Sequence, residues 1–210
     1  MKPMSVFKTG LATLSVIGIM GFSVVSGKKC TLDLDEEQKA FQYLNEFRQH
    51  PVEYGNAIKL HLNKVEPRPV LKWDTILAKV AEEKAMDMAK NDYFAHINNK
   101  GEGINIMVSR AGYTVPDFAL KDKKNNWYES IAWQGGNKDF AVDAKMLINS
   151  LITDKGVASL GHRKHLLGID DDAKHPFDSR LTDIGIGYAI QMSKDNTFKC
   201  YMSVVIASHN

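Results

Sequence analysis

Four residues carry side chains that could do chemistry together: three histidines and one glutamate. His96 ends a Tyr-Phe-Ala-His run, and His162 and His165 lie three residues apart in Gly-His-Arg-Lys-His. Glu129 lies inside an otherwise apolar Trp-Tyr-Glu-Ser-Ile-Ala-Trp run, where a carboxylate is paired, turned toward solvent or functional. Neutral imidazoles suit zinc, and a nearby carboxylate can orient a histidine or contact the metal's water.

Each of these residues also has an ordinary structural interpretation. A single histidine after a helix, such as His96, is usually a cap or a surface group. Histidines at positions i and i+3, such as His162 and His165, can share a helix face and bind a metal, but most such pairs do not. The four residues therefore become a candidate site only if the fold brings them together.

The elements that must position these residues are mostly helices. Periodic apolar residues predict helices over 35–49, from Pro51 to about Leu62, over 74–91, 104–111 and 139–152, and from Gly161 through His165. The helix over 74–91 is the clearest, because Asp74 can cap it and no Gly or Pro interrupts it. Its periodicity places Lys84 on the polar face. We expect polar loops over 113–126, 153–160 and 168–180.

Strands are expected late in the chain, over 127–133, 183–191 and 198–207. In the second of these, Ile184, Ile186 and Tyr188 share one face, and Gly185 and Gly187 share the other, where small residues allow a packed element to approach closely. Strands that are apolar or small on both faces, preceded by helices, predict an α+β fold in which helices cover both faces of a sheet.

The N-terminus predicts export. Residues 1–27 combine Lys2 and Lys8 with an apolar stretch over 11–25 and small residues after it, which is typical of a secretory signal. A membrane anchor is the alternative, although the stretch is short for a span of about 20 residues. We therefore expect one domain over 35–208 in a secreted or cell-envelope protein, in contact with a membrane only through an N-terminal lipid or anchor.

Composition excludes some classes of function. The chain of 210 residues is 44% hydrophobic and 25% charged, which is ordinary for a globular domain. Residues 1–27 hold two of its 27 basic residues and none of its 25 acidic ones, so the rest is close to neutral. A neutral chain without a basic stripe is a poor nucleic-acid binder.

The two cysteines leave three possibilities open. Cys30 and Cys200 could form a disulfide after export, because oxidising compartments allow one. Cys30 could instead carry a lipid, since it follows the apolar stretch, although Lys28 and Lys29 precede it where lipoprotein signals have small residues. Either cysteine could also be free.

Six short motifs, in order, resemble the CAP superfamily, also called the SCP domain family, and most closely its bacterial branch. They lie within residues 37–207, and they are Leu44-Asn45-Glu46-Phe47-Arg48, the stretch from Pro69 to Asp74, Tyr93-Phe94-Ala95-His96, Glu129-Ser130-Ile131-Ala132, the stretch from Gly161 to Leu167, and the stretch from Asp183 to Ala189. Each motif is short, but their common order makes the resemblance specific.

The resemblance implies a three-layer α-β-α sandwich, usually secreted, with a broad cleft. The family places two histidines and up to two acids in this cleft, which here correspond to His96, His162 and Glu129. Some members hold a divalent ion such as zinc on the two histidines, and others bind lipids or sterols. Two protein ligands are one fewer than a usual catalytic zinc site has, so zinc would bind modestly, with water in the open positions.

The chain departs from the family pattern at several positions. Ser130 replaces the usual asparagine, and His165 stands where the family often has asparagine; His165 either adds a metal ligand or hydrogen-bonds to backbone. The second family glutamate has no clear match, and Asp143 and Asp154 are substitutes only by their position in the sequence. The acidic run over 170–172 either attracts calcium or forms a solvated loop.

These observations favour an exported binding module whose cleft of His96, Glu129 and His162 holds a divalent ion, a lipid or a peptide, or recognises a protein partner. A metal-dependent extracellular hydrolase is the alternative, with Glu129 as the catalytic general base beside a metal-activated water. A third interpretation is structural, in which these residues form a buried polar network that fixes the fold.

Overall fold

The computed structural model describes residues 28–137, 139–170 and 178–209. The expected N-terminal signal and two members of the acidic run, Asp171 and Asp172, lie outside the described residues. No helix within the described ranges is long and apolar enough to cross a membrane.

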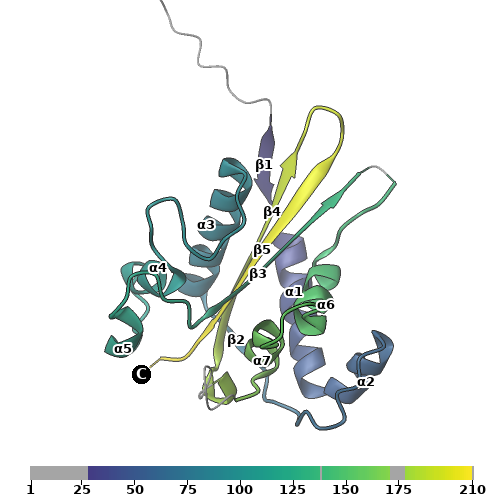
Figure 1. The fold of residues 1–210 in the computed structure, drawn as a ribbon, viewed down its shortest axis with the longest axis vertical. Coiled ribbons are helices and arrows are strands. Elements are labelled where there is room, and N and C mark those ends of the chain that lie inside the picture. The colour runs from purple at the N-terminus through teal and green to yellow at the C-terminus, as the bar shows by residue number, and fades with distance from the viewer. Residues whose placement is uncertain (1–27, 138, 171–177, 210) are drawn as a thin grey trace, which may run out of the picture.

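The described residues form three layers, with a sheet between two groups of helices (Figure 1). This is the α+β sandwich predicted from the sequence. The strands are β1 (Lys29–Leu32), β2 (Lys72–Trp73), β3 (Glu129–Gly136), β4 (Asp183–Met192) and β5 (Phe198–Ala207). The helices are α1 (Leu34–Gln49), α2 (Pro51–Ala57), α3 (Thr75–Asn91), α4 (Ile104–Arg110), α5 (Asp117–Leu120), α6 (Ala144–Thr153) and α7 (Gly161–Leu167), with a 3₁₀ turn at Asp178–Arg180.

The sheet is built around the two long C-terminal strands. Among the described residues the strand order is β1-β4-β5-β3, antiparallel throughout, and the short β2 pairs with the start of β4 in parallel. β3 is therefore an edge strand whose hydrogen-bonded neighbour is β5. Successive side chains of β3 point to opposite faces of the sheet, so this edge can reach elements in both helical layers.

One face of the sheet is covered by α3, which packs closely against β4. The Asp74 side chain accepts hydrogen bonds from the backbone N–H groups of Ile76 and Leu77, which confirms the predicted cap. A Cβ atom added to Gly185 would lie 2.0 Å from the Ala78 nitrogen, and one added to Gly187 would lie 2.3 Å from the Ala81 carbonyl carbon. The predicted small-residue face therefore receives helix backbone directly, as expected.

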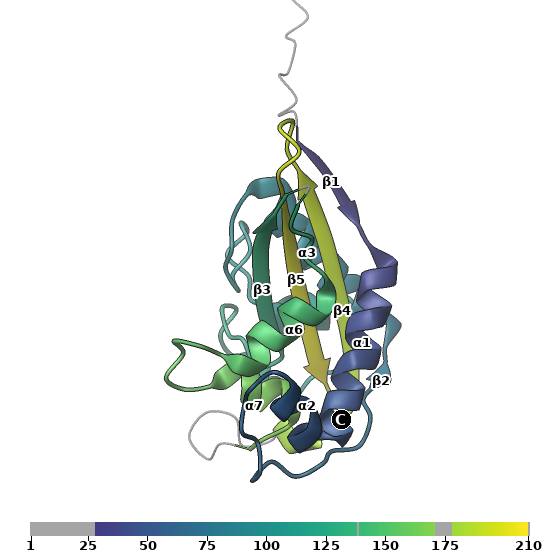
Figure 2. The same cartoon turned by 90° about the vertical axis from the view of Figure 1, so that its right-hand side faces the viewer.

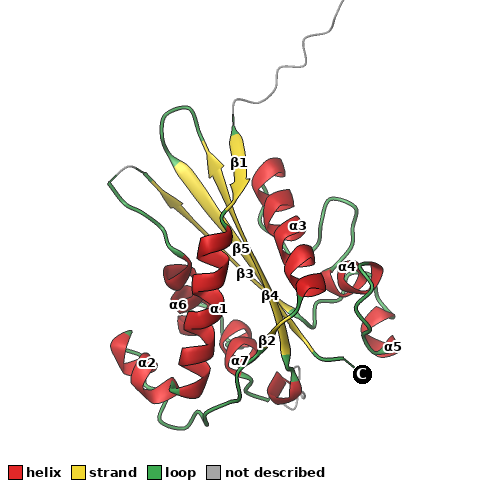
Figure 3. Ribbon diagram, turned by 180° about the vertical axis from the view of Figure 1, so that it is seen from behind, coloured by secondary structure: helices red, strands yellow, loops and turns green. Residues whose placement is uncertain are grey.

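The opposite face is covered by α1, α6 and α7 (Figure 2). The Ile184, Ile186 and Tyr188 side chains are buried on this side, and the Tyr188 hydroxyl donates a hydrogen bond of 2.7 Å to the Val142 carbonyl oxygen before α6. Seen from behind, α4 and α5 lie beside α3, and α2 lies at the C-terminal end of α1 (Figure 3). The candidate site lies where β3, α7 and the loop after α3 come together.

Several boundaries differ from the sequence predictions. β3 runs through Gly135 and Gly136, expected to form a turn, because their backbone pairs with β5. α2 ends at Ala57 rather than near Leu62. Just after Ala57, the Gly55 carbonyl accepts hydrogen bonds from the N–H groups of Ile58 and Leu60, and Lys59 takes a left-handed conformation (φ 60°). The helix expected from 139 begins at Ala144. The short strands β1 and β2 and the four-residue α5 were not predicted.

Of the three possibilities left open for the cysteines, the disulfide between Cys30 and Cys200 is absent, and both cysteines are free. Cys30 lies on β1 and Cys200 on β5, with β4 between them. Two strand spacings amount to about 10 Å, whereas a disulfide needs Cα atoms about 4.4–6.8 Å apart. The sheet order therefore rules out this pairing within one folded chain.

Glu37 is an acid buried where α1 packs on β4. Its Oε1 accepts the Tyr188 backbone N–H at 3.1 Å, and its side chain is nearly inaccessible. Burial raises the pKa of Glu37 from 4.5 to about 7, despite the hydrogen bond from Tyr188. The folded protein thus keeps this proton at pH values where the unfolded chain has lost it, so stability falls as pH rises between 4.5 and about 7.

We predict that Glu37→Gln becomes increasingly stabilising, relative to the original chain, as pH rises from 4.5 to 8. The difference in unfolding free energy should grow by roughly 3 kcal/mol, because each pKa unit is worth about 1.4 kcal/mol. Urea unfolding across this pH range measures it. For the control Glu36→Gln the difference should stay nearly constant over this range: burial acts to raise the pKa of Glu36, but hydrogen bonds from Lys39 and the Ala144 N–H lower it overall, so its pH dependence lies below 4.5. A pH-independent difference for Glu37→Gln contradicts this account.

Candidate functional site

His96 is held by a buried carboxylate of β3. Its Nδ1 atom lies 2.9 Å from Oε2 of Glu129, whose side chain is fully buried, while 34% of the His96 side chain is exposed. The second Glu129 oxygen, Oε1, accepts a hydrogen bond of 2.8 Å from the Ser203 hydroxyl on β5. Glu129 is therefore a paired carboxylate, which is one of the alternatives predicted for it.

Asn126 is a second polar group beside Nδ1 of His96. Its Oδ1 accepts from the Glu129 backbone N–H and its Nδ2 donates to the Glu129 carbonyl, both at 2.9 Å, so the amide cannot be reversed without losing both bonds. Nδ2 also lies 2.9 Å from Nδ1 of His96. We assign the His96 proton to Nδ1, donating to Glu129, because a hydrogen bond to a carboxylate is the stronger of the two possibilities.

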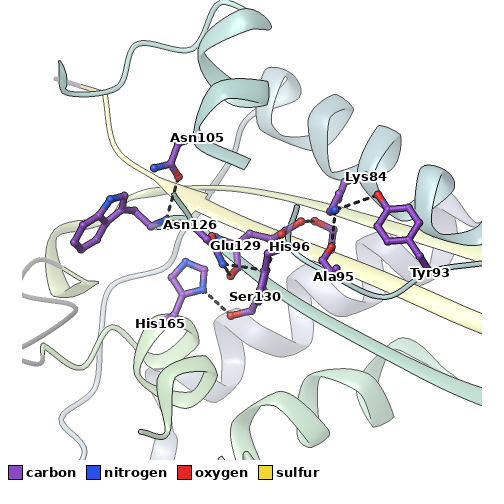
Figure 4. A network of polar contacts seen from close by, with 11 residues as sticks. Lys84, Tyr93, Ala95, His96, Asn105, Asn126, Glu129, Ser130 and His165 are labelled. Carbon is purple, nitrogen blue, oxygen red and sulfur yellow. Dashed lines mark hydrogen bonds and ion pairs between the residues drawn. The ribbon is translucent and has the colours of Figure 1, made fainter. Parts of the chain in front are cut away.

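Lys84, on α3, anchors the segment before His96. This lysine is fully buried, and its ammonium donates to the Ala95 carbonyl at 2.6 Å and to the Tyr93 hydroxyl at 3.2 Å (Figure 4). Burial lowers the pKa of Lys84, while the charges of Glu129 and Asp87 act in the opposite direction. The prediction that Lys84 lies on the polar face of α3 is wrong, because the loop that carries His96 folds over it.

His162 has an arrangement parallel to that of His96. Its Nδ1 atom lies 2.8 Å from Oδ1 of Asp154, whose side chain is 1% exposed, against 28% for His162. Oδ2 of Asp154 accepts the backbone N–H groups of His162 at 3.0 Å and Arg163 at 3.4 Å, in the first turn of α7. One carboxylate thus orients the imidazole and satisfies the free donors of the helix.

The rings of His96 and His162 lie near each other. Their ring centroids are 6.4 Å apart and their planes are inclined by 27°. With each Nδ1 directed to a carboxylate, each Nε2 keeps its lone pair, and neither has a hydrogen-bond partner among the described residues. Both rings line a cavity of 170 Å³. Its other lining residues are Asn126, Trp127, Glu129, Ser130, Val157, Ser159, Gly161 and His165.

Some of the remaining residues predicted from the sequence lie in the site, and others lie elsewhere. His165 lines the cavity, but it bonds to a side chain rather than to backbone: its Nδ1 lies 2.8 Å from the Ser130 hydroxyl. Of the two substitute acids, Asp154 belongs to the site, whereas Asp143 caps α6 by accepting the Met146 N–H. Asp170 accepts from the Ser179 N–H and hydroxyl. Within the described ranges, no three His, Cys, Asp or Glu residues are grouped to hold a metal.

The sequence indicated Asp154 as one of two possible substitute acids, but it predicted neither the pairing of Asp154 with His162 nor the burial of Lys84. Asp154 follows α6 in a left-handed conformation (φ 51°), and Leu160 before α7 does the same (φ 52°), so the loop between them doubles back toward its start. A signal existed in the short spacing from Asp154 to His162, but only this loop conformation brings the carboxylate to the ring.

A comparison with protein-family models identifies the family of the chain. The model of the CAP family, described as the cysteine-rich secretory protein family, matches residues 41–205, so the chain belongs to the CAP family. One similar solved structure is an extracellular protein containing an SCP domain from Bacillus anthracis str. Ames, with 17% identity and a TM-score of 0.42. The match covers 82% of this chain and 41% of that one. The search of curated proteins found no match.

We predict that Asp154→Ala destabilises the protein by about 2–3 kcal/mol, because it removes both the hydrogen bonds to the first turn of α7 and the partner of His162. The matched control is Asp143→Ala, which removes a helix cap away from the site and should cost about 1 kcal/mol. Chemical denaturation measures both. Equal losses would show that the pairing of Asp154 with His162 adds no stability.

Proposed function

We propose that this chain is an exported binding module that holds a divalent ion, most suitably zinc, on Nε2 of His96 and Nε2 of His162. One observation carries the proposal: two partly exposed imidazoles face one cavity, and each has its Nδ1 bound to a buried carboxylate. This is the usual arrangement around a metal-binding histidine, because the carboxylate fixes the tautomer and makes the other nitrogen a better ligand.

The size of the cavity favours an ion over a larger ligand. Pockets for drug-sized ligands occupy about 300–1,000 Å³, whereas this cavity measures 170 Å³. A lipid chain or a long peptide side chain would not fit inside it, although either could lie across its mouth. With two protein ligands, the ion would keep open positions for water or for a small group of a partner.

The surroundings of Glu129 argue against the hydrolase alternative. A general base must reach the water that it deprotonates. Both oxygens of Glu129 already accept hydrogen bonds, from His96 and from Ser203, and the side chain is fully buried. Glu129 is therefore better placed to orient His96 than to act on a metal-bound water.

We predict that the chelator-treated protein binds about one zinc ion per chain in calorimetric titration, and that His96→Ala and His162→Ala each reduce this binding at least tenfold. The control His61→Ala changes an exposed histidine outside the cavity and should bind like the original chain. Equal binding by the His96→Ala, His162→Ala double variant would overturn the proposal.

We also predict no turnover of peptide or ester substrates by the zinc-loaded protein. Glu129→Gln should weaken zinc binding by about 10-fold, because the amide is a poorer acceptor for His96. Release of product from a substrate panel measures activity. Turnover by the original chain that disappears in a zinc-saturated Glu129→Gln variant would instead establish a hydrolase with Glu129 as its base.

A further inference from the structure

The candidate site straddles β3. Glu129 and Ser130 are consecutive residues, so their side chains point to opposite faces of the sheet. Glu129 reaches His96 in the loop after α3, and Ser130 reaches His165 on α7 (Figure 4). His96 and His162 thus approach the site from different layers. The distance between them depends on how α7, which carries His162, packs against β3.

The hydrogen bond between Ser130 and His165 joins α7 directly to β3. It is 2.8 Å long, and its two residues are only 1% and 3% exposed. A hydrogen bond closed off from water has little competition, and breaking it leaves a buried polar group without its partner. The bond therefore constrains the position of α7 more than a surface contact would.

This bond acts close to the metal-binding residues. His165 follows His162 by three residues, so both lie on the same side of α7, and Ser130 follows Glu129 directly.

We propose that Ser130 and His165 are positioning residues that set the spacing between His96 and His162 across the edge strand. This inference rests on the proposed metal function. The pair bonds through Nδ1 of His165 and Oγ of Ser130, and its contribution is to hold α7, and with it His162, against β3. The role differs from that of Asp154, which orients the His162 ring but does not tie it to the sheet.

The test is a double-variant cycle of Ser130→Ala, His165→Phe and both together, each measured for zinc affinity and thermal stability. Each single variant should weaken zinc binding about 5- to 10-fold, and the double variant should weaken it no further, because either change breaks the same bond. The control Tyr188→Phe removes a buried hydrogen bond to Val142, away from the cavity, and should lose stability but not zinc affinity. Unchanged affinity in folded Ser130→Ala, or an equal loss in Tyr188→Phe, would overturn the inference.

A second measurement separates this inference from the proposed metal function. In the metal-free protein, NMR of the imidazole rings should show shifted His162 resonances in Ser130→Ala and unshifted ones in Tyr188→Phe. If the original chain binds no zinc but these shifts occur, the metal function fails and the positioning role stands. If His162 resonances are unchanged in Ser130→Ala, the positioning role fails whatever the zinc result.

Discussion

The site depends on two buried carboxylates, each of which needs hydrogen-bond donors. Taking a charged carboxylate out of water is costly unless hydrogen bonds replace its hydration. Glu129 obtains these bonds from His96 and Ser203, and Asp154 obtains them from His162 and the first turn of α7. Each acid thereby determines which nitrogen of its histidine is occupied and which is left for a ligand. Under the proposed function, the same requirement that stabilises the fold prepares two imidazoles for metal binding.

The rest of the fold serves to bring these two pairs to one place. Close packing of α3 on the small-residue face of β4 fixes one layer, and Lys84 on α3 supports the segment that carries His96. The other layer brings α6 and α7 against the opposite face, and their connection carries Asp154. β3 lies between the layers at the edge of the sheet, where side chains from both can meet without crossing the core.

The sequence predicted the layers and the three principal site residues, because periodicity and short motifs report local conformation and order along the chain. It did not predict the partner of His162, because Asp154 reaches that ring only through two left-handed residues in the connecting loop. Lys84 is a second example of a residue whose surroundings are not local. Periodicity within α3 describes that helix alone, whereas the burial of Lys84 depends on the later loop that carries His96. A disulfide between the cysteines was considered because an oxidising compartment would allow one. The order of strands in the sheet, which no local sequence pattern encodes, keeps the two cysteines too far apart to pair.

The most direct test of the central claim is the protonation of the two site histidines. Nitrogen-15 NMR of the metal-free protein at neutral pH distinguishes the two neutral forms of each imidazole ring. The account predicts that His96 and His162 both carry their proton on Nδ1, with Nε2 unprotonated and available to a metal. A proton on Nε2 of either ring would contradict it, because the buried carboxylates would then not be the groups that prepare the site.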